Sequence, residues 1–87
     1  MQRKIRLVVV FGGASPEHDV SVISASQLMD AVDASRYEVI PVHLGWDNLF
    51  RTGPQLREIP KYRPVPAGLK EAVFSWGERG AEMRVGA

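Results

Sequence analysis

The clearest pattern lies in the first half of the chain, where a short apolar run precedes a segment with helical spacing. Residues 5–11 are β-branched or otherwise apolar except for Arg6, which is typical of a strand covered on both faces. Residues 37–44 form a second apolar run. Between them, residues 17–32 place apolar side chains on one stripe of a helix, at Val22, Ala25, Leu28, Met29 and Val32. The order predicts a strand–helix–strand unit with parallel strands.

Two features of this unit indicate a ligand at one edge. Val20 and Ile23 fall roughly opposite the apolar stripe, so they need a second apolar neighbour, such as a ligand or another domain. Parallel strands also deliver their carboxyl ends, here Gly12 and Leu44, to the same edge of the sheet. Ligands bind at that edge in open α/β sheets.

The second half carries weaker signals. Four of the six prolines lie within residues 54–66, so residues 45–70 are predicted to form a long loop without helix or sheet. Residues 71–75 and 81–85 predict a β-hairpin. We expect four aromatic side chains to form a small satellite core under the loop: Trp46, Phe50, Phe74 and Trp76. Two parallel strands and one helix cannot cover each other completely, so we expect a larger unit to continue the sheet.

Composition excludes several classes of protein. The 87 residues, 45% hydrophobic and 24% charged, suit one soluble globular domain. Eleven basic against ten acidic residues exclude a strongly basic nucleic-acid module, and the absence of cysteine excludes disulfides and thiolate metal sites. The longest aliphatic or aromatic run, residues 7–11, is far below the ~20 residues that span a bilayer. We therefore expect a cytoplasmic protein with neither membrane nor nucleic acid as partner.

The candidate chemistry follows the first strand. Gly12 and Gly13 permit a tight turn and a close approach of another group to the backbone. Ser15 is predicted as the helix N-cap and Pro16 as the first helical residue. The first turn of the helix would then present Glu17, His18 and Asp19 at its positive end.

Each of these side chains has a structural and a functional interpretation. Glu17 could compensate the helix dipole, worth ~0.3–1 kcal/mol, or hold the ammonium group of a ligand. Asp19 and Ser21 could be local caps or ligand contacts. We expect His18 to be a hydrogen bonder at the surface or behind the site, and His43 to be a structural histidine. The histidine or acid that a metal site would need four residues from His18 is absent, so no metal site is predicted.

A longer motif adds a family resemblance. Residues 9–22, Val-Val-Phe-Gly-Gly-Ala-Ser-Pro-Glu-His-Asp-Val-Ser-Val, with Ser24-Ala25 after them, resemble the N-terminal signature of D-alanine–D-alanine ligases, ATP-grasp enzymes of peptidoglycan synthesis. The similarity continues through residues 36–42 and 44–47. It implies an α/β fold: an incomplete, parallel βαβ Rossmann-like (pre-ATP-grasp) unit with a long loop and a C-terminal β-hairpin. Residues 1–87 would be an N-terminal domain fragment, without the central and ATP-grasp domains.

The resemblance also implies roles for individual residues. Glu17 would be the catalytic-site residue that holds the ammonium of the first D-alanine, with Val20 as an apolar neighbour of that substrate. Gly13 and Ser21 would complete the substrate contacts. ATP and Mg²⁺ would bind to domains outside this chain, and the enzyme would be a homodimer. The 87 residues alone are predicted to have no ligase activity.

Alternatives remain at this point. Within the family, the chain could belong to a D-alanine–D-lactate or D-alanine–D-serine ligase. From another class, it could be a non-catalytic βαβ interaction module. A nucleotide-binding Rossmann half is disfavoured, because neither G-x-G-x-x-G nor G-x-x-x-x-G-K-[ST] is present and a carboxylate in the first helical turn would repel phosphate.

Overall fold

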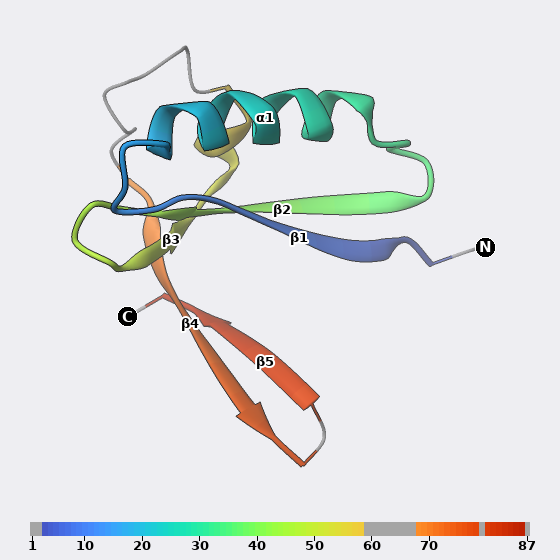
Figure 1. Ribbon diagram of the computed structural model, residues 1–87. Coiled ribbons are helices and arrows are strands. Elements are labelled where there is room, and N and C mark those ends of the chain that lie inside the picture. The colour runs from blue at the N-terminus through green and yellow to red at the C-terminus, as the bar shows by residue number, and fades with distance from the viewer. Residues whose placement is uncertain (1–2, 59–67, 79, 87) are drawn as a thin grey trace.

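One mixed sheet with a helix on one face organises the chain. The computed structural model describes residues 3–58, 68–78 and 80–86. Figure 1 shows α1 lying along β1 and β2, while the β4–β5 hairpin extends away from the helix. The elements in chain order are β1 (Ile5–Gly12), α1 (His18–Ala31), β2 (Tyr37–Leu44), β3 (Phe50–Thr52), the 3₁₀ helix η1 (Pro54–Glu58), β4 (Lys70–Gly77) and β5 (Gly80–Val85).

The predicted strand–helix–strand unit is confirmed. β1 and β2 pair in parallel from Ile5↔Tyr37 to Gly12↔Leu44, so both strands end at one edge of the sheet. The sheet continues in the order β1-β2-β3-β4-β5, and every pairing after the first is antiparallel. The α/β class and the C-terminal hairpin agree with the sequence-based expectation.

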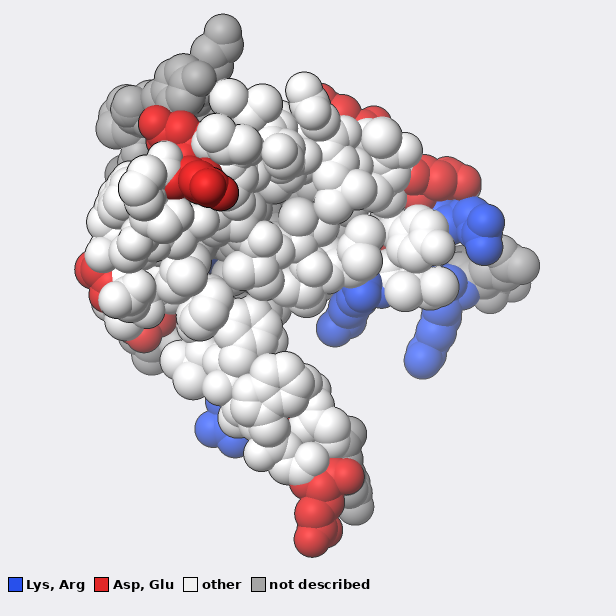
Figure 2. Space-filling view, viewed as in Figure 1, with Lys and Arg blue, Asp and Glu red and all other residues white. Residues whose placement is uncertain are grey.

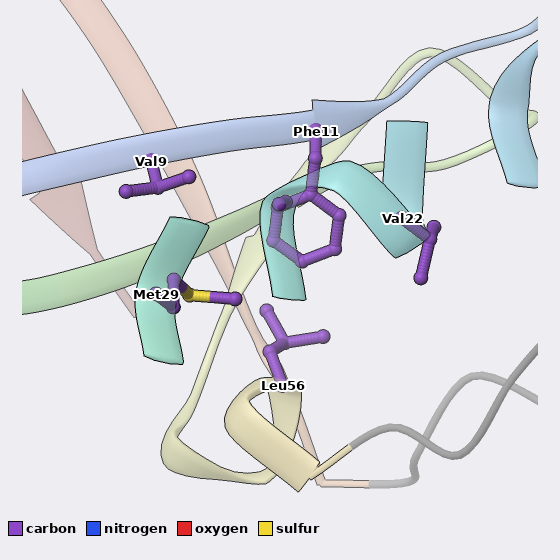
Figure 3. Close-up of a cluster of buried hydrophobic side chains, with 6 residues drawn as sticks. Val9, Phe11, Val22, Met29 and Leu56 are labelled. Atoms are coloured by element: carbon purple, nitrogen blue, oxygen red, sulfur yellow. The ribbon is translucent and has the colours of Figure 1, made fainter. Parts of the chain in front are cut away.

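The core lies between α1, β1 and η1. Figure 3 shows Met29 and Val22 of the helix facing Val9 and Phe11 of β1, with Leu56 of η1 closing the cluster. Ala25 completes it, and each of these side chains is at most 7% exposed. Burial of this kind stabilises a fold by roughly 25 cal/mol per Å² of apolar surface.

Two predictions about burial were wrong. β1 is covered on one face, because Val8 and Val10 are 37% and 50% exposed while Val9 and Phe11 are buried. Alternate residues of a strand point to opposite faces, and in the described residues α1 packs on one of them. Leu28 is 51% exposed although it was placed on the helix stripe. It lies one residue, hence about 100° around the helix, from the buried Met29.

The segment predicted as a loop without helix or sheet contains both. β3 pairs with β2 and β4, and η1 places Leu56 in the core. A strand of three residues is too short to show an alternating pattern, and tertiary pairing therefore decides it. Residues 59–67 of that predicted loop lie outside the described residues.

The expected satellite core of aromatic side chains is confirmed in one pair. Phe50 and Phe74 meet edge to face, with ring centroids 5.0 Å apart. Trp46 and Trp76 are 60% and 81% exposed, so their assignment to a core was wrong. No helix among the described residues has the length and apolar character needed to cross a membrane.

Candidate functional site

The turn after β1 is pressed against the end of β2. Gly12 and Gly13 have φ angles of +100° and +105°, in the region that favours glycine. The Gly13 N–H donates to the Leu44 carbonyl oxygen at 2.8 Å. A Cβ atom on Gly12 would lie 2.5 Å from that same oxygen and 2.9 Å from Cδ2 of His43. Gly12 is thus required by the close approach of β2, whereas Gly13 faces open space.

The helix begins later than the sequence predicts. Glu17, not Ser15, is the N-cap residue, and no side chain caps the helix. Ser15 forms a turn before it, since its carbonyl oxygen accepts from the His18 N–H at 3.1 Å and its hydroxyl accepts from the Glu17 N–H at 3.2 Å. Pro16 lies inside this turn rather than at the first helical position.

Glu17 is exposed at the positive end of α1. Its carbonyl oxygen accepts the Ser21 N–H at 2.9 Å, which fixes its backbone to the first turn. Within residues 3–58, 68–78 and 80–86, no hydrogen bond or ion pair holds its carboxylate. The backbone of Glu17 is therefore held at the start of α1, and its exposed carboxylate is available to a cationic group.

The other residues predicted to contact substrate are Gly13, which precedes Glu17 in the chain, and Val20 and Ser21, which follow it. Val20 is 61% exposed on α1, and Gly13 leaves open space above the turn. The Ser21 hydroxyl accepts a hydrogen bond from the Gly12 N–H at 3.0 Å, which ties the helix to the glycine turn. Ser21 thus has a structural role here, and its contact with substrate stays a prediction.

Two buried histidines, His18 and His43, lie next to the glycine turn and the start of α1. Nε2 of His18 and Nε2 of His43 are 2.8 Å apart, and the two side chains belong to residues only 6% and 2% exposed. Nδ1 of His18 contacts Oδ1 of Asp19 at 3.1 Å, and the Trp46 ring stacks on His18 with centroids 4.7 Å apart. The surface location considered for His18 was wrong, while its hydrogen-bonding role is confirmed.

The surroundings of His43 favour its neutral form. Burial lowers its pKa from the usual 6.5, and the nearby His18 and Arg51 lower it further, whereas Asp47 acts in the opposite direction. Its Nδ1 atom is buried and has no hydrogen-bond partner among the described residues. Sequence reasoning assigned the two histidines separately. Aligning β1 and β2 in parallel pairs Phe11 with His43, and that alignment would have predicted that His43 lies near the start of the helix.

The β2–β3 turn lies beside the two histidines, since its Trp46 stacks on His18. Oδ1 and Oδ2 of Asp47 accept from Nη1 and Nη2 of Arg51 at 3.1 and 2.6 Å. These bonds, with a hydrogen bond from the Leu49 N–H, lower the pKa of Asp47 to about 2. Beside them lies an open depression of about 450 Å³, lined by His43, Gly45, Trp46, Asp47, Arg51, Gly68 and Leu69. The ion pair gives the turn a defined conformation.

A phosphate and a metal ion place different requirements on the start of α1 and the described residues around it. In the part of the chain that the structure describes, no cluster of three His, Cys, Asp or Glu side chains could hold a metal ion. The start of α1 carries the Glu17 carboxylate, which would repel a phosphate group at that helix terminus. This edge of the sheet therefore favours an ammonium group over the phosphates of a nucleotide.

Comparisons with known proteins identify the family. Residues 6–81 match the sequence family described as "D-ala D-ala ligase N-terminus". D-alanine–D-alanine ligase of Corynebacterium glutamicum strain R is 44% identical over 90 aligned residues, covering 85% of this chain and 25% of that protein. D-alanine–D-alanine ligase A of Brucella suis is 59% identical over 39 residues, 45% of this chain and 11% of the relative.

Solved structures show the same fold. The D-alanine–D-alanine ligase of Coxiella burnetii superimposes with a TM-score of 0.76 at 17% identity, over 98% of this chain and 27% of that one. The VanG D-Ala:D-Ser ligase of Enterococcus faecalis gives 0.72 at 21% identity, over 95% and 26%. The chain spans about a quarter or less of the length of these relatives. On the match over residues 6–81, the chain belongs to the family of D-alanine–D-alanine ligase N-terminal domains.

Proposed function

We propose that this chain supplies the first-substrate site of a D-alanine–D-alanine ligase, with Glu17 holding the ammonium group of the first D-alanine. The observation that carries the proposal is the Glu17 carboxylate, fixed by its backbone at the start of α1 and without a protein partner among the described residues. Val20, exposed on the next turn, would contact the methyl group of the substrate. Gly13 would let the substrate approach the backbone, and Ser21 would hold the turn in place.

The physical role of such a site is positioning. A fixed carboxylate orients a small zwitterion, so that its own carboxylate points toward the activating groups. ATP, with Mg²⁺, would be bound by parts of the ligase outside these 87 residues and would transfer its terminal phosphoryl group to the carboxylate of the first D-alanine. The amine of a second D-alanine would then attack that acyl carbon, lose a proton and displace phosphate to form the new amide bond. The chain by itself would therefore release no phosphate when it is incubated with ATP, Mg²⁺ and D-alanine.

The test is Glu17→Gln in the complete protein that contains this chain. Loss of the charge should raise the KM for the first D-alanine about 10- to 100-fold, because hydrogen bonds to charged groups contribute about 1.5–3 kcal/mol. Asp30→Asn is the matched control, since Asp30 is an exposed carboxylate near the other end of the same helix. It should leave the KM unchanged.

Two outcomes would contradict the proposal. An unchanged KM with a lower melting temperature would show that Glu17 serves the helix dipole. A complete protein that forms no D-alanyl-D-alanine would remove the ligase assignment. Mass spectrometry of the product distinguishes the dipeptide from D-alanyl-D-serine and from the D-lactate depsipeptide, which this chain does not discriminate.

A further inference from the structure

The histidine pair beneath the glycine turn is placed to control the loop that carries Glu17. His18 is the first residue of α1 and follows Glu17 directly. His43 comes from β2, 25 positions later, and its ring lies within 2.9 Å of where a Gly12 side chain would begin. The two rings meet edge to face with centroids 4.9 Å apart, so the pair joins the end of β2 to the start of the helix.

The contacts around the pair select one arrangement of protons. Two Nε2 atoms 2.8 Å apart need one donor and one acceptor. If Nδ1 of His18 donates to Oδ1 of Asp19, then Nε2 of a neutral His18 is the acceptor and Nε2–H of His43 is the donor. The remaining buried atom, Nδ1 of His43, is then an unprotonated acceptor. The opposite tautomer of His43 would bury an N–H without a partner.

The charged groups around the pair come from three segments. Asp19 lies on α1 and contacts His18, while Asp47 of the β2–β3 turn and Arg51 of β3 act on His43. Asp47 and Arg51 bond to each other, and among the described residues neither forms a hydrogen bond with the His43 ring. The Nε2–H donor of His43 therefore joins β2 to the His18 ring, which also contacts Asp19 and stacks on Trp46.

We propose that His43 is a positioning residue: its Nε2–H donates to Nε2 of His18 and thereby holds the Glu17 carboxylate in its substrate-binding position. This inference rests on the proposed function, because it assigns Glu17 the contact with D-alanine. His43 itself is only 2% exposed, so its effect on the substrate would be indirect. Its effect reaches the site through the His18 ring and the peptide that links His18 to Glu17.

The experiment compares His43→Gln with His43→Asn in the complete ligase. The amide nitrogen of Gln lies as many bonds from Cα as Nε2 of histidine, so it can donate to His18. The shorter Asn places its nitrogen at the level of Nδ1 and cannot. We expect His43→Asn to raise the KM for the first D-alanine about tenfold, with kcat within threefold of the parent, since one hydrogen bond of this kind is worth about that factor. His43→Gln should stay within twofold.

A double-mutant cycle with Glu17→Gln separates this inference from the proposed function. If His43 acts through Glu17, His43→Asn should add nothing once Glu17 is Gln. A full tenfold further rise in that background, or a normal KM in His43→Asn alone while Glu17→Gln raises it, would overturn the positioning role only. A normal KM in Glu17→Gln would overturn the proposed function itself.

A spectroscopic measurement decides the case even if His43→Asn does not fold. In the parent ligase labelled with ¹⁵N-histidine, we expect the His43 signals to show a protonated Nε2 and an unprotonated Nδ1. His18 should show the reverse. The His43→Gln variant assigns the His43 signals by their loss. A His43 ring protonated on Nδ1, or a signal in fast exchange between tautomers, would contradict the proposal.

Discussion

The strand–helix–strand unit of residues 5–44 and the β4–β5 hairpin are both rich in apolar side chains, yet they bury them to different extents. The first contributes Phe11 and Met29 to the core, at 4% and 3% exposed. In the hairpin, Val73, Trp76 and Val85 are 52%, 81% and 49% exposed. The face seen in Figure 2 shows the hairpin as an arm with basic atoms near its base, uncharged side chains along its middle and acidic atoms at its tip.

This difference explains where the candidate chemistry lies. Glu17 and the two histidines are attached to elements that the core fixes, so their geometry is defined by packing. The hairpin joins the sheet through β3, and of its side chains Ala72 is buried. Segments with few buried contacts open at a lower free energy than core elements. We therefore expect the hairpin to tolerate substitutions that the first unit does not.

The largest effect is expected from Phe11→Ala. Removing a buried phenylalanine should lower the free energy of unfolding by about 3–5 kcal/mol, because the lost burial and the cavity add together. Urea unfolding followed by far-UV circular dichroism measures it. Phe74→Ala is the matched control in the hairpin, where the same residue type is half-buried. Equal losses in the two variants would contradict the contrast drawn between the regions.

The second largest effect on stability is expected at the glycine turn, where β2 lies close to the Gly12 backbone. Gly12→Ala and Gly13→Ala both force a side chain onto a positive φ, but a Cβ at Gly12 also meets the Leu44 oxygen at 2.5 Å. Gly12→Ala should therefore destabilise the fold by about 1–3 kcal/mol more than Gly13→Ala, the typical range for overpacking. The same unfolding experiment compares them. Similar values for the two variants would show that β2 does not press on the turn.

A pH dependence of stability should come from His43. Because burial lowers its pKa below 6.5, the unfolded chain binds more protons than the folded chain between the two pKa values. Stability is therefore complete above pH 6.5 and falls as the pH is lowered toward the folded pKa, by at most about 1.4 kcal/mol per pH unit. Unfolding measured from about pH 7.5 to about pH 5 should show this slope.

The His43→Gln variant is the control for that slope, since it keeps the donor and removes the titrating ring. Its stability should vary less with pH over the same range. Asp33 and Asp47, whose pKa values are lowered from 3.8, lose their contributions only at more acidic pH and leave this window clear. An unchanged slope in His43→Gln would assign the dependence to other groups.

The smallest effect is expected from Trp76→Ala. Although tryptophan is the largest side chain, at 81% exposed it should contribute less than about 0.5 kcal/mol to the stability of this chain. The urea midpoint should therefore stay close to that of the parent. A loss approaching that of Phe11→Ala would show that the hairpin packs against the rest of the protein.

Several features of the molecule could be predicted from local patterns. The apolar run, the glycine pair and the helical spacing of Val22, Ala25 and Met29 predicted β1, the turn, α1 and β2 in order. The resemblance over residues 9–22 led to the family that the comparisons show. These features depend on residues close together in the chain, whose spacing reflects the geometry of the element that they form.

Other features depend on which elements meet. Leu28 and Trp76 are apolar, but no described element packs over them enough to bury them. β3 exists because β2 and β4 flank it, and Leu56 is buried because η1 returns to α1. Pairing of strands and docking of a helix are long-range events, which composition and periodicity over a few residues do not encode.

The candidate site joins both kinds of information. A carboxylate after a glycine turn can be predicted from the sequence, since Glu17 follows Gly12 and Gly13 by only a few residues. The contact between His18 and His43 arises from the parallel register of β1 and β2, which brings residues 25 positions apart to 2.8 Å. Tertiary packing also excludes water from these rings, and that exclusion turns two ordinary histidines into a donor–acceptor pair.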